Sequence, residues 1–182
     1  MSASIITSEQ DLRYPIGRYE PATHITAQNR ANWLRDLEEL PAKLRATVAG
    51  LNQYQLDTPY RPGGWTVRQV VHHLPDSHLN SYVRFRLALT ENSPAIKTYE
   101  EAAWAELPDA RTAPIEISLN LLEALHARWL ALLTSLTDAD FARTFQHPEW
   151  GNINLEWTLG MYAWHSRHHV AQITSLRKRE GW

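Results

Sequence analysis

The 182-residue sequence contains no cysteine. This absence excludes disulfide bonds, thiolate metal ligands and a cysteine nucleophile, and it fits a cytoplasmic protein. The chain also lacks a large excess of positive or negative charge, since its net charge is −2 with histidine neutral. We therefore expect neither nucleic acid nor a membrane as a partner. No window approaches the apolar run of a membrane span, and MSASIITSEQDLRYPIG lacks the basic and apolar regions of a secretory signal. Any chemistry must use histidine, carboxylate or hydroxyl groups, or a bound cofactor.

The composition is that of an ordinary folded domain. Apolar residues make up 43% and charged residues 21% of the chain, whose length is enough for one domain with a sizeable core. We therefore expect a single domain over 1–182. Residues 1–25 show no sustained periodicity, and the prolines Pro15 and Pro21 predict an extended N-terminal arm packed on that domain.

Four long segments have apolar side chains at the three- and four-residue steps that are typical of helices. They cover about 26–50, 66–90, 115–136 and 155–180. Because strand signals are almost absent, this pattern predicts an all-α four-helix bundle. The long connections at 92–114 and 137–154 allow crossovers; we expect a short helix at 99–106, another in TDADF, and a loop or small hairpin in TFQHPEWGNINL.

Helix boundaries are also indicated. Thr66 and Gln69 have the spacing of a capping box at the start of the second helix, and Asn154 can cap the fourth. Pro41 and Pro75 lie inside the first two helices, where we expect them to produce kinks.

Six of the nine histidines lie in two short windows, VVHHLPDSH (70–78) and YAWHSRHHVAQI (162–173). His165 and His169 are four residues apart and share one helix face, which continues through apolar positions and therefore points inward. Two inward imidazoles are costly unless their nitrogens find partners, and one divalent cation would serve both. His168 projects to the side of this stripe, beside Trp164.

The second helix leaves alternatives open. His72 and His73 point about a quarter turn apart, so at most one of them easily faces the other pair. His73 begins a polar stripe that is either solvated surface or the wall of a pocket, and that continues through Ser77, Asn80, Ser81 and Arg84. His72 has the position of a buried structural histidine, and His78 lies almost on the apolar stripe. The alternative reading is that all these histidines lack a ligand, and we assign no role to His24, His126 and His147.

The segments GGWTVRQVVHHLPDSHLNSYVRFRLALTE and GMYAWHSRHHVAQI resemble the DinB-like superfamily of metal-binding four-helix bundles. YPIGRYEP and LDTPYRPGGWTVRQVVHHL resemble its YfiT branch, described as metal-dependent hydrolases and linked to bacillithiol transfer. The resemblance spans 14–182. It implies a homodimer and three metal ligands, namely His73, which precedes a leucine as in the family, together with His165 and His169. Pro75 departs from the family, which commonly has a small helix former there.

Three neutral imidazoles without thiolate suit Zn²⁺ or Ni²⁺ first, with Mn²⁺, Fe²⁺ and Co²⁺ as further choices. One ion per chain with three protein ligands keeps a coordination position open, as in catalytic sites. We therefore expect a metal-dependent hydrolase that activates water and acts on a small molecule. The alternatives are an S-transferase using a low-molecular-weight thiol such as bacillithiol, a non-catalytic metal-binding stress protein, and a metal-free interaction module. The proton-handling group stays unassigned, with candidates at Asp76, Ser77, Arg84 and Tyr162.

Overall fold

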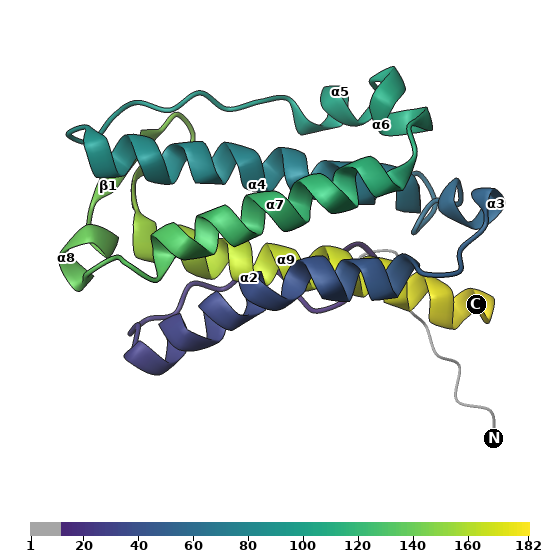
Figure 1. The fold of residues 1–182 in the computed structure, drawn as a ribbon, viewed down its shortest axis with the longest axis horizontal. Coiled ribbons are helices and arrows are strands. Elements are labelled where there is room, and N and C mark those ends of the chain that lie inside the picture. Colours follow the sequence, from purple (N-terminus) through teal and green to yellow (C-terminus); the bar gives the residue numbers. More distant parts are fainter. Residues whose placement is uncertain (1–11) are drawn as a thin grey trace.

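Four long helices form the frame of the computed structural model, which describes residues 12–182 (Figure 1). They are α2 (Ala27–Val48), α4 (Val67–Thr90), α7 (Ile115–Leu133) and α9 (Leu155–Glu180). The predicted all-α four-helix bundle is confirmed. The third helix ends three residues before the predicted boundary.

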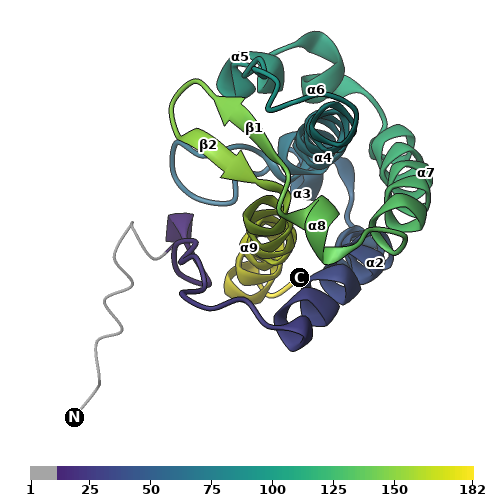
Figure 2. The ribbon, with the colours of Figure 1, turned by 90° about the vertical axis from the view of Figure 1, so that its left-hand side faces the viewer.

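The helices are not arranged in chain order around the bundle. Both α2 and α4 pack against α7 and α9, so that α2 lies diagonally opposite α4 when the bundle is viewed from its end (Figure 2). Helices α4 and α7 run in the same direction, opposite to α2 and α9 (Figure 1). Parallel neighbours need a connection that returns along the bundle, and residues 91–114 provide this crossover. The segment 134–154, in contrast, stays at one end.

Side-chain caps explain where three of the long helices begin. The hydroxyl of Thr66 accepts a hydrogen bond from the Gln69 amide at 3.1 Å, and the Gln69 side chain accepts one from the Thr66 amide at 2.9 Å, as the sequence predicts. Thr26 caps α2 in the same way, and Asn154 accepts from the amide of Trp157 at 2.7 Å. Helices α2 and α4 each continue as one element through their internal proline.

Short elements fill the connections. They are α3 (Gln53–Leu56), α5 (Glu101–Ala105), α6 (Pro108–Thr112), α8 (Asp138–Phe141) and an antiparallel hairpin of β1 (Thr144–His147) and β2 (Gly151–Asn154). The hairpin, α5 and α8 lie in segments where the sequence predicts them. Helices α3 and α6 are not predicted from the sequence, because one turn of helix is too short to show periodicity.

The apolar core is divided along the length of the bundle. One cluster contains Phe85, Trp129 and Tyr162, and the other contains Leu74 and Ile173, each with further residues of the four long helices. Between the two clusters lies a layer of buried polar side chains, namely His73, His78, His126, His169 and Gln172. Because burying polar groups is costly unless they are paired, this layer is where function is to be sought.

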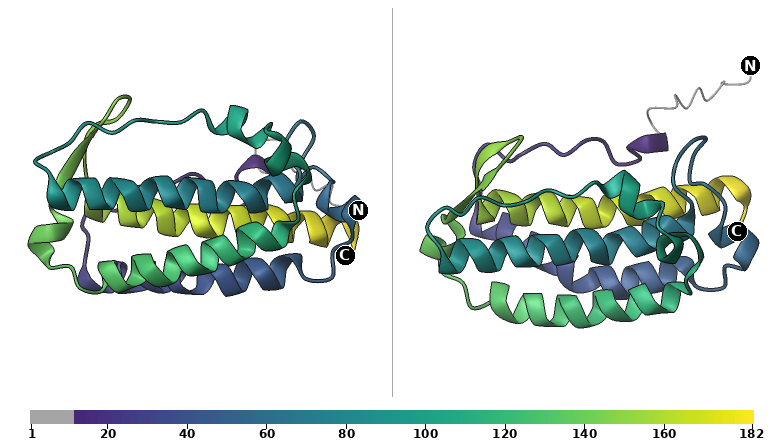
Figure 3. Two further views of the ribbon diagram at one scale, coloured as in Figure 1. Left: turned by 45° about the horizontal axis from the view of Figure 1, so that its top comes forward. Right: turned by 90° about the horizontal axis from the view of Figure 1, so that it is seen from above.

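Residues 12–26 run along the outside of α9 (Figure 3). The backbone carbonyl of Gly17 accepts from the Trp164 indole at 3.3 Å, and the Tyr19 hydroxyl donates to the carbonyl of Trp157 at 3.3 Å. Residues 1–11 of the predicted arm lie outside the described residues. Within 12–182, no helix combines the length and the apolar character that crossing a bilayer requires.

Candidate metal centre

Three histidine nitrogens converge between α4 and α9. The Nε2 atom of His165 lies 3.2 Å from Nε2 of His73 and 3.1 Å from Nε2 of His169. Two nitrogens that each lie about 2.1 Å from one Zn²⁺ are at most about 4.2 Å apart, so both separations fit a shared ion. The structure therefore brings together the three histidines that the sequence analysis selected as metal ligands.

A chain of hydrogen bonds determines which nitrogen of His165 carries its proton. The carbonyl of Leu37 on α2 lies 2.7 Å from Nδ1 of His126 on α7, and because a carbonyl only accepts, this Nδ1 is the donor. Nε2 of the neutral His126 therefore accepts from Nδ1 of His78 at 2.9 Å. In turn, Nε2 of His78 accepts from Nδ1 of His165 at 3.2 Å. This leaves a bare lone pair on Nε2 of His165.

The chain requires neutral imidazoles, and burial provides them. Burial lowers the pKa of His126 to about 4 and that of His73 to about 3. The pKa values of His78, His165 and His169 also fall well below the usual range, because burial disfavours the imidazolium and the neighbouring imidazoles would repel one another if charged. All five are therefore neutral at pH 7, the form that binds metal.

Gln172 fixes the proton of His169 in a similar way. Its Nε2 donates to the carbonyl of Arg13 at 3.0 Å and to Nε2 of His168 at 2.9 Å, which orients the amide. Its Oε1 then accepts from Nδ1 of His169 at 2.9 Å. His168 stacks on Trp164 with ring centroids 4.5 Å apart, so it supports the centre from the side.

These orientations test whether the residues fit a metal. Nε2 of His165 and Nε2 of His169 both present lone pairs, and they face each other at 3.1 Å. Two such lone pairs repel unless a cation lies between them. The donor set therefore fits a divalent cation, and the partners of His165 and His169 are of the kind that orient ligating imidazoles in metal sites.

The three histidines line a cavity of about 790 Å³, a size typical of small-molecule sites. The ring of Trp65 covers His73, with centroids 4.7 Å apart. Further walls come from α4, α9, the segment before α5 and the hairpin, including Ser77, Arg84, Tyr99, His147 and Tyr162.

Not all of the candidates for the proton-handling group lie at the cavity. Ser77, Arg84 and Tyr162 line the cavity, as expected. Asp76, the remaining candidate for the proton-handling group, does not line the cavity, and burial together with Asp109 raises its pKa to about 6. Asp76 lies on the face of α4 that is turned toward α6.

His72 is also directed away from the ligands. Its Nδ1 lies 2.7 Å from the Ser118 hydroxyl, and its Nε2 lies 3.2 Å from the carbonyl of Ala113. It therefore has the structural position that the sequence suggested, joining α4 to α7.

Two supporting residues, His126 and Gln172, are not predicted from the sequence. We assigned no role to His126, but it is almost fully buried and belongs to the chain that orients His165. A signal was available, because His126 lies on the same helical stripe as Leu119, Leu122 and Trp129. A histidine on an apolar stripe needs a buried partner, although the sequence does not identify it.

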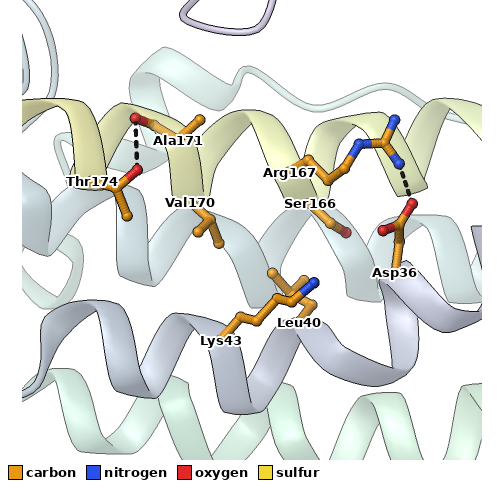
Figure 4. A pocket seen from close by; sticks show the side chains of 8 residues that line it. All are labelled: Asp36, Leu40, Lys43, Ser166, Arg167, Val170, Ala171 and Thr174. Carbon is orange, nitrogen blue, oxygen red and sulfur yellow. Dashed lines mark hydrogen bonds and ion pairs between the residues drawn. The ribbon is translucent and has the colours of Figure 1, made fainter.

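A second hollow of about 290 Å³ lies between α2 and α9 (Figure 4). Its wall contains an ion pair between Asp36 and Arg167 but none of the histidines. It is thus separate from the metal centre and carries none of its chemistry.

Comparison with known proteins agrees with the fold. The profile of the DinB superfamily matches residues 36–173. A Bacillus subtilis protein named "Putative metal-dependent hydrolase YfiT" is 56% identical over 173 residues, covering 94% of this chain and 97% of that protein. A Bacillus cereus protein named "Putative metal-dependent hydrolase" is 56% identical over 172 residues, covering 94% and 99%.

Two solved structures are similar to this one. The structure of YfiT from Bacillus subtilis, described as having an unusual four-helix bundle topology, gives a TM-score of 0.92 at 56% identity and covers 94% of this chain and 99% of that chain. The four-helix bundle protein TT2238 gives a TM-score of 0.57 at 22% identity, covering 80% and 98%. At that identity, the second likeness concerns the fold alone.

Proposed function

This chain belongs to the DinB superfamily, and we propose that it is a metal-dependent hydrolase of a small molecule, with one divalent cation held by His73, His165 and His169. One observation carries the proposal. Nε2 of His165 and Nε2 of His169 lie 3.1 Å apart, and hydrogen bonds to the other nitrogen of each ring leave both Nε2 atoms with a free lone pair. The names of the Bacillus relatives support the same activity.

Zn²⁺ and Ni²⁺ are the ions that suit three neutral imidazoles best. When bound, such a cation supplies Lewis acidity, which polarises a carbonyl or phosphoryl group and generates a nucleophile from water near neutral pH. The protein holds the ligands in one orientation through His78 and Gln172, and Trp65 shields His73 from solvent.

A second candidate is S-transfer from a low-molecular-weight thiol. Within residues 12–182, the group that can hold the ion consists of histidines only, so the ligand group itself contains no carboxylate that could serve as a general base. The carboxylates of the cavity wall, Glu100, Glu101 and Glu149, belong to exposed residues. A thiol needs no such base, because coordination to a cation is enough to deprotonate it.

Elemental analysis of protein purified without an affinity tag is the first test. We expect one divalent ion per chain, lost in His73→Ala and in His165→Ala. His24→Ala, which removes an exposed histidine outside both clusters, is the matched control and should keep the ion. A wild-type protein without stoichiometric metal after incubation with Zn²⁺ or Ni²⁺ would contradict both candidates.

Turnover then separates the candidates. Metal-dependent cleavage of a member of an ester and amide panel supports hydrolysis. Loss of free thiol only when metal and an electrophile are both present supports S-transfer. Tight metal binding with neither reaction would instead favour a non-catalytic metal-binding protein.

A further inference from the structure

Arg84 is a buried cation without a partner. Only 8% of the residue is exposed, and neither an ion pair nor a hydrogen bond joins its side chain to another residue within 12–182. The other buried arginine of α4 behaves differently: Arg68 donates to the Asp57 carboxylate at 2.8 Å and to the carbonyl of Ala113 at 3.0 Å. Because a buried charge without a partner is expensive, Arg84 requires an explanation beyond folding.

The position of Arg84 supplies that explanation. Its side chain lines the same cavity as the three metal-binding histidines. It follows His73 by three turns on α4, so the two backbone positions are about 16 Å apart along the helix axis. The cavity thus has the candidate cation site toward one end and a fixed positive charge toward the other.

Two other polar residues of the cavity wall, Tyr99 and His147, are compatible with a bound hydrogen-bond acceptor. Tyr99 also lines this cavity, and its buried hydroxyl has no hydrogen-bond partner within 12–182, so it is a second donor that lacks an acceptor. His147, the imidazole on the hairpin wall, has its pKa lowered by burial and by the charge of Arg84, which outweigh the opposite effect of the Glu149 carboxylate. It is therefore neutral at pH 7 and adds no second positive charge.

We propose that Arg84 binds a carboxylate of the substrate, at the opposite end of the cavity from the bond that reacts at the metal. A guanidinium is matched in shape to a carboxylate, with which it forms two parallel hydrogen bonds. Arg84 carries a single positive charge and the Glu149 carboxylate also lies near His147, so a singly charged carboxylate is favoured over a doubly charged phosphate. The inference rests on the proposed metal centre and adds the substrate class: a small anionic molecule whose carboxylate is remote from the reacting group.

Bifunctional ligands of graded length test the proposal by binding rather than by turnover. The monohydroxamates of succinic, adipic, suberic and sebacic acids carry a metal-binding group at one end and a carboxylate at the other. Each is compared by calorimetry with its own neutral methyl ester on Zn²⁺-bound protein. We expect the acid to bind about tenfold to a hundredfold more tightly than the ester, only at the lengths that span the cavity.

Variants assign the effect to Arg84. In Arg84→Met the acid should lose its advantage while the affinity of the ester stays unchanged, and the unfolding midpoint of the metal-free protein should not fall, because an uncompensated charge is removed. Arg86→Met is the matched control: Arg86 is exposed on the same helix, outside the cavity, and its loss should leave the preference for the acid intact.

Equal binding of acid and ester at every length would overturn the proposal without any variant, and so would an acid preference that persists in Arg84→Met. In both cases the hydroxamates still bind through the metal, and the proposed function stands. If no hydroxamate binds the Zn²⁺-bound protein, the proposed function fails and the inference fails with it.

Discussion

Nε2 of His126 lies 2.9 Å from Nδ1 of His78, and this contact connects the metal centre to the far side of the bundle. Through it, a backbone carbonyl on α2 determines the tautomer of a ligand on α9. The four helices are thus joined in one polar layer, and three of them orient a group on the fourth. Four predictions follow from the contacts of this layer and from its charge state.

Replacing His126 should weaken metal binding although His126 is not a ligand. In His126→Leu, His78 loses the acceptor that fixes its proton, and His165 is no longer held in the ligating tautomer. We expect metal affinity to fall about tenfold to a hundredfold, measured by competition with a chromophoric chelator. Nitrogen NMR should show a mixture of tautomers at His165.

His72→Leu is the control for this prediction. It removes another buried histidine, which lies on α4 and bonds to Ser118, so it should lower stability without changing metal affinity. An unchanged affinity in His126→Leu would show that the chain does not orient His165.

Gln172 should link the N-terminal segment to the metal centre. Gln172→Leu removes both the acceptor for His169 and the donor to the carbonyl of Arg13, so metal affinity should fall and proteolysis near residue 13 should become faster. Trp164→Phe removes the indole donor to the carbonyl of Gly17 but keeps an aromatic ring beside His168, so it should loosen the segment with little effect on affinity. Equal affinities of Gln172→Leu and the wild type would refute the link.

Metal should stabilise the folded protein, because the ligands are close together only when α4 and α9 are packed. At a free concentration one hundred times Kd, a ligand that binds only the folded state adds about 2.7 kcal/mol. We therefore expect the thermal unfolding midpoint to rise with Zn²⁺ and to return after chelation. In His165→Ala the midpoint should not respond to Zn²⁺, and a response of wild-type size would count against the assigned ligands.

The metal-free protein should lose stability in mild acid. The pKa values of His126 and His168 are lowered to about 4 from an ordinary value of 6.5, so between these limits the unfolded chain binds protons that the folded chain does not. Stability should therefore be unaffected above pH 6.5, fall from pH 6.5 toward 4, and continue to fall below 4, because the pKa of His73 is lowered to about 3. Asp76, whose pKa is raised to about 6, opposes this trend, but it is one group against several histidines.

Denaturant midpoints across this pH range provide the measurement, and His126→Leu should flatten the curve. A midpoint that rises from pH 7 to pH 5 would mean that the histidines are not buried in their neutral form.

The local features of this fold follow from the sequence. Apolar side chains at helical spacing predict the four long helices, and the caps at Thr66 and Asn154 lie where the structure has them. The pairing of His165 with His169 is equally local, because four residues are close to one helical turn. These features depend on neighbours along the chain, and the sequence alone determines them.

Only the tertiary structure decided which groups meet from different helices. His73 rather than His72 joins the other ligands because of the way α4 is turned against α9, and His126 reaches His78 because a long crossover makes α7 a parallel neighbour of α4. Arg84 and Arg68 are both buried on α4, but the packing places the Asp57 carboxylate beside Arg68 and no such partner beside Arg84 within 12–182. The angle at which one helix faces another depends on contacts across the whole core, and helical periodicity does not encode it.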